Sequence, residues 1–144
     1  MSHSYSQNIL HLVFSTKNRR KTIPKQMQAR LWAYMAAICQ KNKIFVHAIG
    51  GMDDHAHILM RLPPTLAEAQ AILLVKTDSS KWMGKGFAWQ KGYGSFSVSK
   101  SIMPAVIRYI QNQERHHKKM TFEEEFVALL KKHGVEFDPK YVFG

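Results

Sequence analysis

The hydrophobic positions of this chain alternate between two kinds of spacing. Short apolar or alternating runs are typical of strands, because successive side chains of a strand point to opposite faces; they cover residues 9–14, 44–49, 55–62 and 96–98. Apolar residues three or four positions apart are typical of helices, which are predicted at residues 23–43, 66–82, 102–113 and 121–133. This order predicts an α+β fold of the ferredoxin-like (RRM-like) kind, an antiparallel sheet with helices on its faces.

Turn and cap residues support these boundaries. Residues 50–54, with two glycines and two aspartates, are typical of a turn, so the second and third strands should form a hairpin. Thr65 with Glu68 and Thr121 with Glu124 each have the spacing of a capping box, which predicts the start of a helix at both places.

Length and composition favour one domain, residues 1–144. The 21 lysines and arginines outnumber the 10 acidic residues, giving a formal net charge of +11, which favours a polyanionic partner. Charge alone does not identify that partner, since many basic proteins bind no nucleic acid. Cys39 has no cysteine partner and lies in a helical pattern, where a buried thiol is expected.

Targeting signals are missing from the sequence. The first residues lack a basic, then apolar, signal-peptide pattern, and no apolar run is long enough to cross a bilayer. With a single cysteine, this predicts a protein of the cytoplasm that has no membrane partner.

Candidate chemistry begins with His55 and His57 on the third predicted strand. Residues i and i+2 of a strand share a face, about 7 Å apart at their α-carbons, so these imidazoles could hold one cation. The apolar residues between and after them, such as Ala56 and Ile58, fall on the opposite face. An isolated pair is a weak signal, because strand histidines are often plain surface residues.

Tyr109 and Gln113 form the second candidate pair. On one helix, residues i and i+4 share a face, so the phenol would lie beside the amide. A tyrosine alone is more often a core or interface residue, but next to the histidine pair it is a candidate nucleophile.

Three segments, "DDHAHILMRL", "WQKGYGSFSVS" and "VIRYIQNQERHH", resemble the single-tyrosine HUH endonucleases in kind, order and separation. The resemblance is to the small transposases of minimal bacterial insertion sequences and their relatives associated with repetitive extragenic palindromes. It extends from about Tyr5 to the C-terminus. The middle residue of the histidine motif, Ala56, is smaller than usual but still apolar.

This resemblance implies a function and a site. His55, His57 and Gln113 would be metal ligands, and Tyr109 would attack single-stranded DNA near a hairpin to form a 5′-phosphotyrosine link. The DNA could then be rejoined without ATP. Relatives are dimers in which the tyrosine helix of one subunit can serve the histidines of the other, so a homodimer is expected.

The implied ligands suit Mg²⁺ or Mn²⁺. Two neutral imidazoles and an amide oxygen leave the cation its full charge and open positions for phosphate oxygens. A structural zinc site usually has four ligands, often thiolates, and one cysteine cannot supply them. The phenol of Tyr109, with an ordinary pKa near 10, needs nearby positive charge to react at neutral pH.

Further residues could contact DNA or the site. A basic loop and a stretch rich in glycine and aromatic residues are candidates for phosphate contacts: Lys17, Arg19, Arg20, Lys21, Lys85 and Lys91. The aromatic residues beside the last two, Trp82, Phe87, Trp89 and Tyr93, suit stacking on unpaired bases, although Trp89 and Phe96 could equally be core. His116 and His117 could contact phosphate or be solvated at a helix end.

The acidic run 123–125 is expected to complement the N-terminus of the last helix rather than to bind metal. His11 receives no role. Two other functions remain open: a protein of the same fold that binds structured nucleic acid without cutting it, and a metal-independent two-histidine phosphoesterase. The second needs His-x-Ser/Thr motifs, which the sequence lacks.

Overall fold

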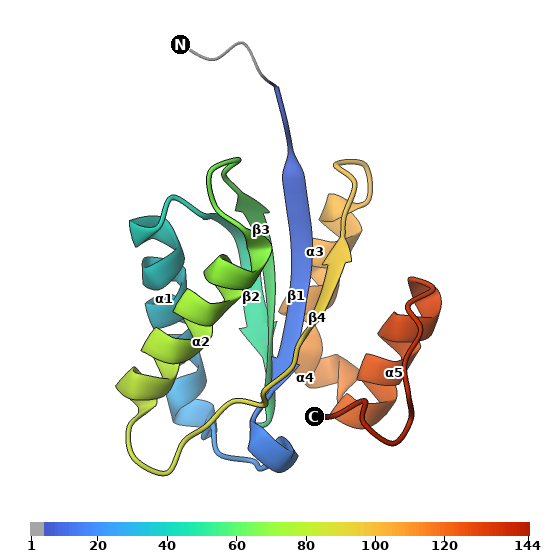
Figure 1. Cartoon of the computed structure of the whole chain (residues 1–144). Helices are drawn as coiled ribbons and strands as arrows, with labels where there is room; N and C mark the ends of the chain where they lie inside the picture. Colours follow the sequence, from blue (N-terminus) through green and yellow to red (C-terminus); the bar gives the residue numbers. More distant parts are fainter. Residues whose placement is uncertain (1–4) are drawn as a thin grey trace.

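β1 and β3 form the centre of the sheet. The computed structural model describes residues 5–144, so the first part of the segment searched for a signal peptide lies outside the described residues. Within that range the strands pair antiparallel in the order β2-β3-β1-β4 (Figure 1). They are β1 (Asn8–Ser15), β2 (Phe45–Gly51), β3 (His55–Leu62) and β4 (Gly94–Ser97). The predicted ferredoxin-like fold and the β2–β3 hairpin are confirmed.

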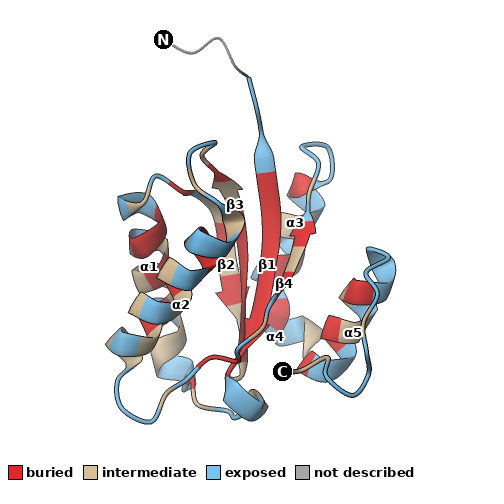
Figure 2. Ribbon diagram, in the orientation of Figure 1, coloured by how far each residue is buried: buried red, intermediate tan, exposed pale blue. Residues whose placement is uncertain are grey.

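Helices cover both faces of this sheet (Figure 1). One face carries α1 (Lys25–Lys41) and α2 (Glu68–Met83). The other carries α3 (Met103–Gln111), α4 (Gln113–His116) and α5 (Phe122–Lys132), while a short 3₁₀ turn, η1 (Lys17–Arg19), follows β1. Both central strands are buried along most of their length (Figure 2).

The period of two along β3 divides its side chains between the two faces. Ala56, Ile58 and Met60 pack with α1 and α2 in the larger core, as the pattern predicted. Leu59 lies on the opposite side, in the cluster beneath α3. Burial of one apolar side chain stabilises the folded state by about 1.5–3 kcal/mol, so packing on both faces contributes to the stability of β3.

α3 lies close against β2 at Gly50. A β-carbon at Gly50 would lie 2.5 Å from the carbonyl oxygen of Ile110, much closer than van der Waals contact. Ile110 itself is buried with Leu59 and Ala48. Glycine at this strand position therefore allows the backbone of α3 to approach the sheet.

The helix carrying Tyr109 is interrupted, which corrects the prediction of one continuous helix through Gln113. α3 ends at Gln111, and Asn112 leaves the helical region with φ −104° and ψ 25°. The Asn112 side chain donates to the carbonyl of Arg108 at 2.9 Å, a local bond that competes with helix continuation.

One of the two predicted capping boxes is wrong. α2 begins at Glu68 after Ala67, and the Glu68 carboxylate accepts a hydrogen bond from Ser95 at 2.8 Å instead of closing a box with Thr65. The second box is confirmed, with Thr121 Oγ1 accepting from the amide of Glu124 at 3.2 Å.

Cys39 is fully buried in α1, as expected, and burial raises the pKa of its thiol to about 11. Among the helices within residues 5–144, none combines the length and the apolar character needed to cross a membrane.

Candidate active site

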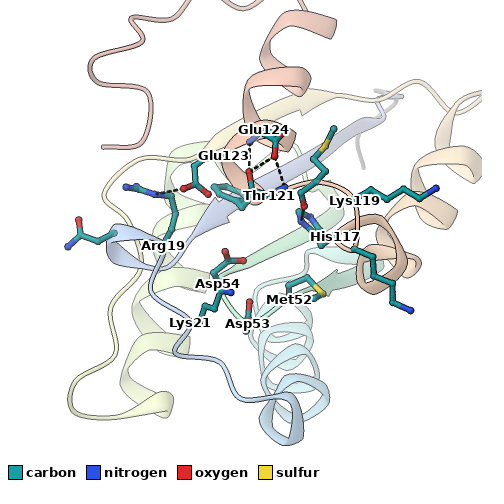
Figure 3. Close-up of a pocket in the computed structure, with 14 residues that line it drawn as sticks. Arg19, Lys21, Met52, Asp53, Asp54, His117, Lys119, Thr121, Glu123 and Glu124 are labelled. Atoms are coloured by element: carbon teal, nitrogen blue, oxygen red, sulfur yellow. Dashed lines mark hydrogen bonds and ion pairs between the residues drawn. The ribbon is translucent and has the colours of Figure 1, made fainter.

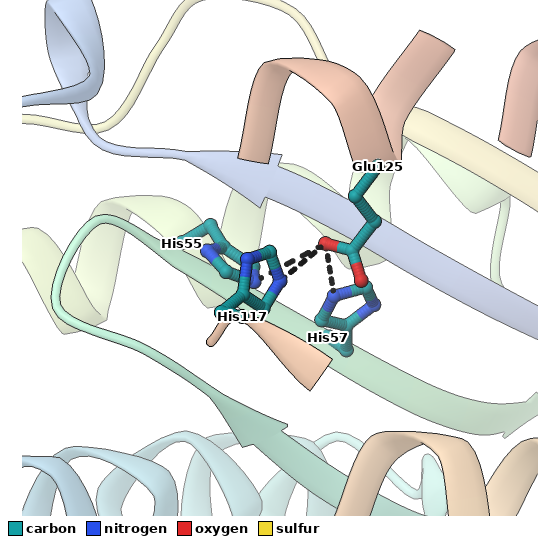
Figure 4. Close-up of side chains that lie close together, drawn as sticks. All are labelled: His55, His57, His117 and Glu125. Carbon is teal, nitrogen blue, oxygen red and sulfur yellow. Dashed lines mark hydrogen bonds and ion pairs between the residues drawn. The ribbon is translucent and has the colours of Figure 1, made fainter. Parts of the chain in front are cut away.

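His55 and His57 lie side by side on the face of β3 that looks toward α4 and α5. Both side chains are fully buried. His117, just after α4, and Glu125, on α5, approach them from the opposite side (Figure 4). The potential ligand atoms of these four residues, called the ligand cluster below, lie within 4.8 Å of one another.

Glu125 is at the centre of the ligand cluster. Its Oε1 lies 3.3 Å from His55 Nε2, 3.1 Å from His57 Nε2 and 3.0 Å from His117 Nε2 (Figure 4). The residue is only 1% exposed. Three imidazole nitrogens thus surround one buried carboxylate oxygen.

The acidic run lies in the first turn of α5, as expected, but Glu125 differs from the other two in pointing inward. Glu124 caps α5, and Glu123 lies 3.7 Å from Arg19 in an ion pair. Glu125 instead shares the inner side of α5 with Phe122 and Phe126, both buried. That 122, 125, 126 spacing is the sequence signal for an inward-facing acid, and helical periodicity alone could have identified it.

Both ring nitrogens of His55 face acceptor oxygens. Its Nδ1 lies 2.7 Å from Asp54 Oδ1 and its Nε2 lies 2.8 Å from Gln113 Oε1. The amide of Gln113 is oriented by its Nε2, which donates to Glu125 Oε2 at 3.1 Å. A neutral imidazole has one N–H, so it cannot donate to acceptors on both sides.

His117 has the same geometry. Its Nδ1 lies 2.7 Å from the carbonyl oxygen of Met120, and its Nε2 faces Glu125 Oε1. His55 and His117 therefore each need either a second proton or a metal ion on Nε2. A divalent cation at the point where these Nε2 atoms and Glu125 Oε1 converge would satisfy all of them, so the residues fit a metal.

The charges of the cluster shift its pKa values in keeping with this geometry. Burial raises the pKa of Glu125. The nearby histidines act in the other direction through their charges and hydrogen bonds, and they outweigh burial: His57, His117 and His55 together hold the pKa of Glu125 well below its usual range. Burial lowers the pKa of His117. Its hydrogen bond with Glu125 and the negative charge of that carboxylate have a larger, opposite effect, so the pKa of His117 is raised. For His57 burial prevails, and its pKa is lowered.

Tyr109 is joined to the ligand cluster through Glu125. Its phenol oxygen donates a short hydrogen bond to Glu125 Oε2, the oxygen that also accepts from Gln113. Burial, followed by the charge and hydrogen bond of Glu125, raises the pKa of Tyr109 above its ordinary value. His116 Nε2 lies 3.5 Å from the same phenol oxygen. The four residues expected from the sequence, His55, His57, Tyr109 and Gln113, thus lie together in one chain.

His11, which received no role from the sequence, supports this site from β1. It is buried, and its Nε2 lies 2.8 Å from His57 Nδ1. Val13 is the cross-strand partner of His57, so His11, two residues earlier, lies on the same face. His11 can be recognised as a neighbour of His57 only when the pairing of β1 with β3 is known.

A cleft of about 580 Å³ opens beside the ligand cluster (Figure 3). It lies between the η1 turn, the β2–β3 turn and the link from α4 to α5, and His117 forms part of its wall. Its basic residues are Arg19, Lys21, Lys118 and Lys119, and acidic residues, among them Asp53, also line it. Of the predicted DNA contacts, Lys17, Arg20 and Lys21 are exposed near this cleft, whereas Arg19 is half-buried in its pair with Glu123.

The second predicted group of DNA contacts lies elsewhere. Lys85 and Lys91 are exposed in the connection from α2 to β4. The aromatic residues interleaved with them mostly face inward: Trp89 is buried and donates to Ser79 Oγ at 2.9 Å, Phe87 packs on it, and Trp82 stacks on Tyr34. Trp89 therefore belongs to the core, which was the alternative the sequence left open for it. Trp82 and Phe87 are partly buried and Tyr93 is exposed, so stacking of these three on bases stays a prediction.

The family and the fold of this chain can be compared with those of known proteins. The sequence matches the family described as "Transposase IS200 like" over residues 4–113. The chain therefore belongs to the IS200-like transposase family, and its role is that of a transposase. His117 and Glu125 lie beyond the matched residues.

Two solved structures have a similar fold. A candidate transposase from Deinococcus radiodurans R1 is 21% identical, with a TM-score of 0.64 over 78% of this chain and 95% of that chain. A REP-associated tyrosine transposase bound to a REP hairpin is 13% identical, with a TM-score of 0.64 over 81% of this chain and 73% of that chain. A comparison with curated proteins gives no match.

Proposed function

We propose that this chain is a single-domain, metal-dependent transposase of single-stranded DNA that nicks and rejoins DNA near hairpins through a 5′-phosphotyrosine link. One observation carries the proposal: the carboxylate of Glu125 faces the Tyr109 phenol with one oxygen and three imidazoles with the other. A nucleophile and a set of metal ligands are therefore next to each other inside one chain. This proximity is what attack on a metal-bound phosphodiester requires.

His55, His57 and Gln113 would hold Mg²⁺ or Mn²⁺, with His117 and Glu125 as further ligands that the sequence did not indicate. Bound there, the cation would neutralise charge on the non-bridging phosphate oxygens. With Glu125 included the set is no longer uncharged, and mixed imidazole and carboxylate ligation favours Mn²⁺ over Mg²⁺. Asp54 orients His55 by accepting from Nδ1, which leaves Nε2 free for a metal.

Tyr109 would supply the attacking oxygen. In the proposed step a bond forms between the phenol oxygen and phosphorus while the bond from phosphorus to the 3′-oxygen breaks. The phenol proton passes along its hydrogen bond to Glu125 Oε2, and the departing 3′-oxygen takes up one proton and leaves as a hydroxyl, so that no net proton is gained or lost. The phosphotyrosine conserves the energy of the broken bond, so a 3′-hydroxyl can later reverse the attack and rejoin DNA.

Single-stranded or hairpin DNA is the proposed partner. The formal charge of +11 favours a polyanion, and one relative of the same fold is bound to a REP hairpin. A homodimer and residence in the cytoplasm remain part of the proposal. In the single chain, Tyr109 already contacts Glu125 without a second subunit.

The proposal predicts a covalent adduct that depends on metal. Labelled hairpins with randomised single-stranded flanks, incubated with the protein and Mn²⁺, should give a protein–DNA band on denaturing electrophoresis. Chelator should abolish it, and His57→Ala should reduce it by at least about a hundredfold because a buried ligand is lost. An equal adduct in chelator would contradict the metal site.

The matched control for His57→Ala is His47→Ala, since His47 lies on the adjacent strand outside the ligand cluster. It should cleave like the wild type. Tight hairpin binding by the wild type with no adduct in Mn²⁺ would instead favour the non-cleaving nucleic-acid binder.

The proposed DNA contacts predict a steep salt dependence of hairpin binding. Replacing Lys17, Arg20 and Lys21 together by alanine should lower the slope of log K against log salt by about two, because each phosphate contact releases condensed counterions. The Lys85→Ala/Lys91→Ala pair should change the slope less, since these two lysines lie away from the cleft beside the ligand cluster. Filter binding across a salt series measures both slopes, and an unchanged slope in the triple variant would remove the η1 turn from the DNA interface.

A further inference from the structure

Tyr109 forms part of the walls of two hollows that differ in character. The first, about 320 Å³, lies between the β4–α3 connection, α3 and α5, and is called the α3–α5 pocket below. The second, about 450 Å³, lies beside α4 and the residues that follow it. Both hollows adjoin the residue that the proposed function makes the nucleophile.

The α3–α5 pocket has mainly apolar walls. Val98, Ala105, Val106 and Leu129 line it, and these side chains come from three separate segments of the chain. Its volume is near the lower end of the range for small-ligand pockets, about 300 to 1,000 Å³. An apolar hollow of this size suits one flat aromatic group and is too small for a base pair within a duplex.

Polar groups surround those walls. Lys132 and His133 contribute two exposed basic side chains from the end of α5, and Ser97 and Ser99 contribute hydroxyls from the β4–α3 connection. His133 is held in place by stacking on Phe96, with ring centroids 4.5 Å apart. An apolar interior with a lysine, an imidazole and hydroxyls around it matches a nucleobase with its sugar and phosphate.

The second hollow suits backbone rather than a base. Arg115 and Lys119 are exposed there, and His116 lies next to the Tyr109 phenol. Two cations in an open hollow can hold phosphates of any sequence. The two sides of Tyr109 therefore offer an apolar place for a base and a basic place for the continuing strand.

We propose that the α3–α5 pocket binds the unpaired base of a nucleotide next to the phosphodiester that Tyr109 attacks, while Arg115 and Lys119 hold the phosphates on the other side. The inference rests on the proposed function and adds a subsite to it. Only an unstacked, unpaired base can enter, so the pocket selects single-stranded DNA at the cleaved position.

The first test needs no cleavage. Metal-free protein with labelled methyl groups is titrated with the single-stranded tetranucleotide dT4 and with a tetramer of abasic sites. We expect dT4 to shift the methyl resonances of Val98, Val106 and Leu129, while the abasic tetramer leaves them in place. Equal shifts with both tetramers, or no shift with dT4, would overturn the base subsite.

The second test fills the pocket. Ala105 is exposed on α3, so Ala105→Trp puts an indole over the pocket without disturbing the core, and Ala37→Trp makes the same change at an exposed position of α1, on the other face of the sheet. Ala105→Trp should weaken dT4 binding about tenfold or more, in keeping with the stacking of a base, and lower the adduct yield equally. Ala37→Trp should change neither dT4 binding nor the adduct yield. Melting temperatures equal to that of the wild type would show that both variants are folded.

The two proposals can fail separately. Base-dependent methyl shifts, with no adduct from any hairpin in Mn²⁺, would refute the cleavage function and leave the base subsite standing. A normal adduct from Ala105→Trp, with unchanged dT4 binding, would refute the subsite and leave the cleavage function standing.

Discussion

Tyr109→Phe should abolish the covalent adduct and leave hairpin binding nearly intact. The substitution removes only the phenol oxygen, and with it the hydrogen bond to Glu125 Oε2. Since no other group in the proposed mechanism can form the phosphotyrosine, the adduct should fall by at least about a thousandfold. Binding depends on phosphate and base contacts elsewhere and should change by less than about threefold. Denaturing electrophoresis measures the adduct, and filter binding measures affinity.

The matched control is Tyr93→Phe. Tyr93 is exposed before β4 and takes no part in the ligand cluster, so this variant should form the adduct at the wild-type rate. Adduct formation by Tyr109→Phe at a comparable rate would assign the attack to another residue.

Glu125→Gln should have the second-largest effect. The side chain keeps its shape but loses its charge, and one of its two terminal atoms becomes an amide donor facing either the imidazoles or Tyr109. If Glu125 is a ligand, Mn²⁺ affinity measured by calorimetry should fall at least about a hundredfold, and adduct yield at low Mn²⁺ should fall with it. Raising Mn²⁺ should restore part of that yield.

Glu123→Gln provides the control on the same helix. Its carboxylate is half-exposed and faces Arg19 outside the ligand cluster, so Mn²⁺ affinity should stay within about twofold of the wild type. Wild-type Mn²⁺ affinity in Glu125→Gln would show that this carboxylate orders the histidines without binding the metal.

Much of the sheet could be predicted because its pattern is local. The bounds of β3 agree with the sequence prediction at both ends, since His55 follows a turn and two prolines follow Leu62. The alternation within that strand also put its two histidines on the face opposite Ala56 and Ile58, where they are. Period-two patterns decide both strand extent and facing, without knowledge of distant residues.

Glu125 could have been found from the helical spacing it shares with Phe122 and Phe126, but His117 and His11 depend on tertiary packing and could not. Nothing near His117 in the sequence indicates that the α4–α5 link turns it toward Glu125. His11 became recognisable only through the pairing of β1 with β3. At the break at Asn112, a side-chain bond to Arg108 competes with helix continuation. His11 and His117 are brought to the site by contacts between segments far apart in the sequence, which local periodicity does not show.

Gly50 has a consequence for stoichiometry. Because it lets α3 rest directly on β2, Tyr109 is fixed against the sheet of its own chain, beside that chain's Glu125. Under the proposed function, each molecule would therefore carry its nucleophile and its metal ligands in one chain, and would hold one DNA end at a time. In the proposed chemistry a nick requires a single copy of the protein, whereas exchanging two ends requires two copies to act together on the same DNA.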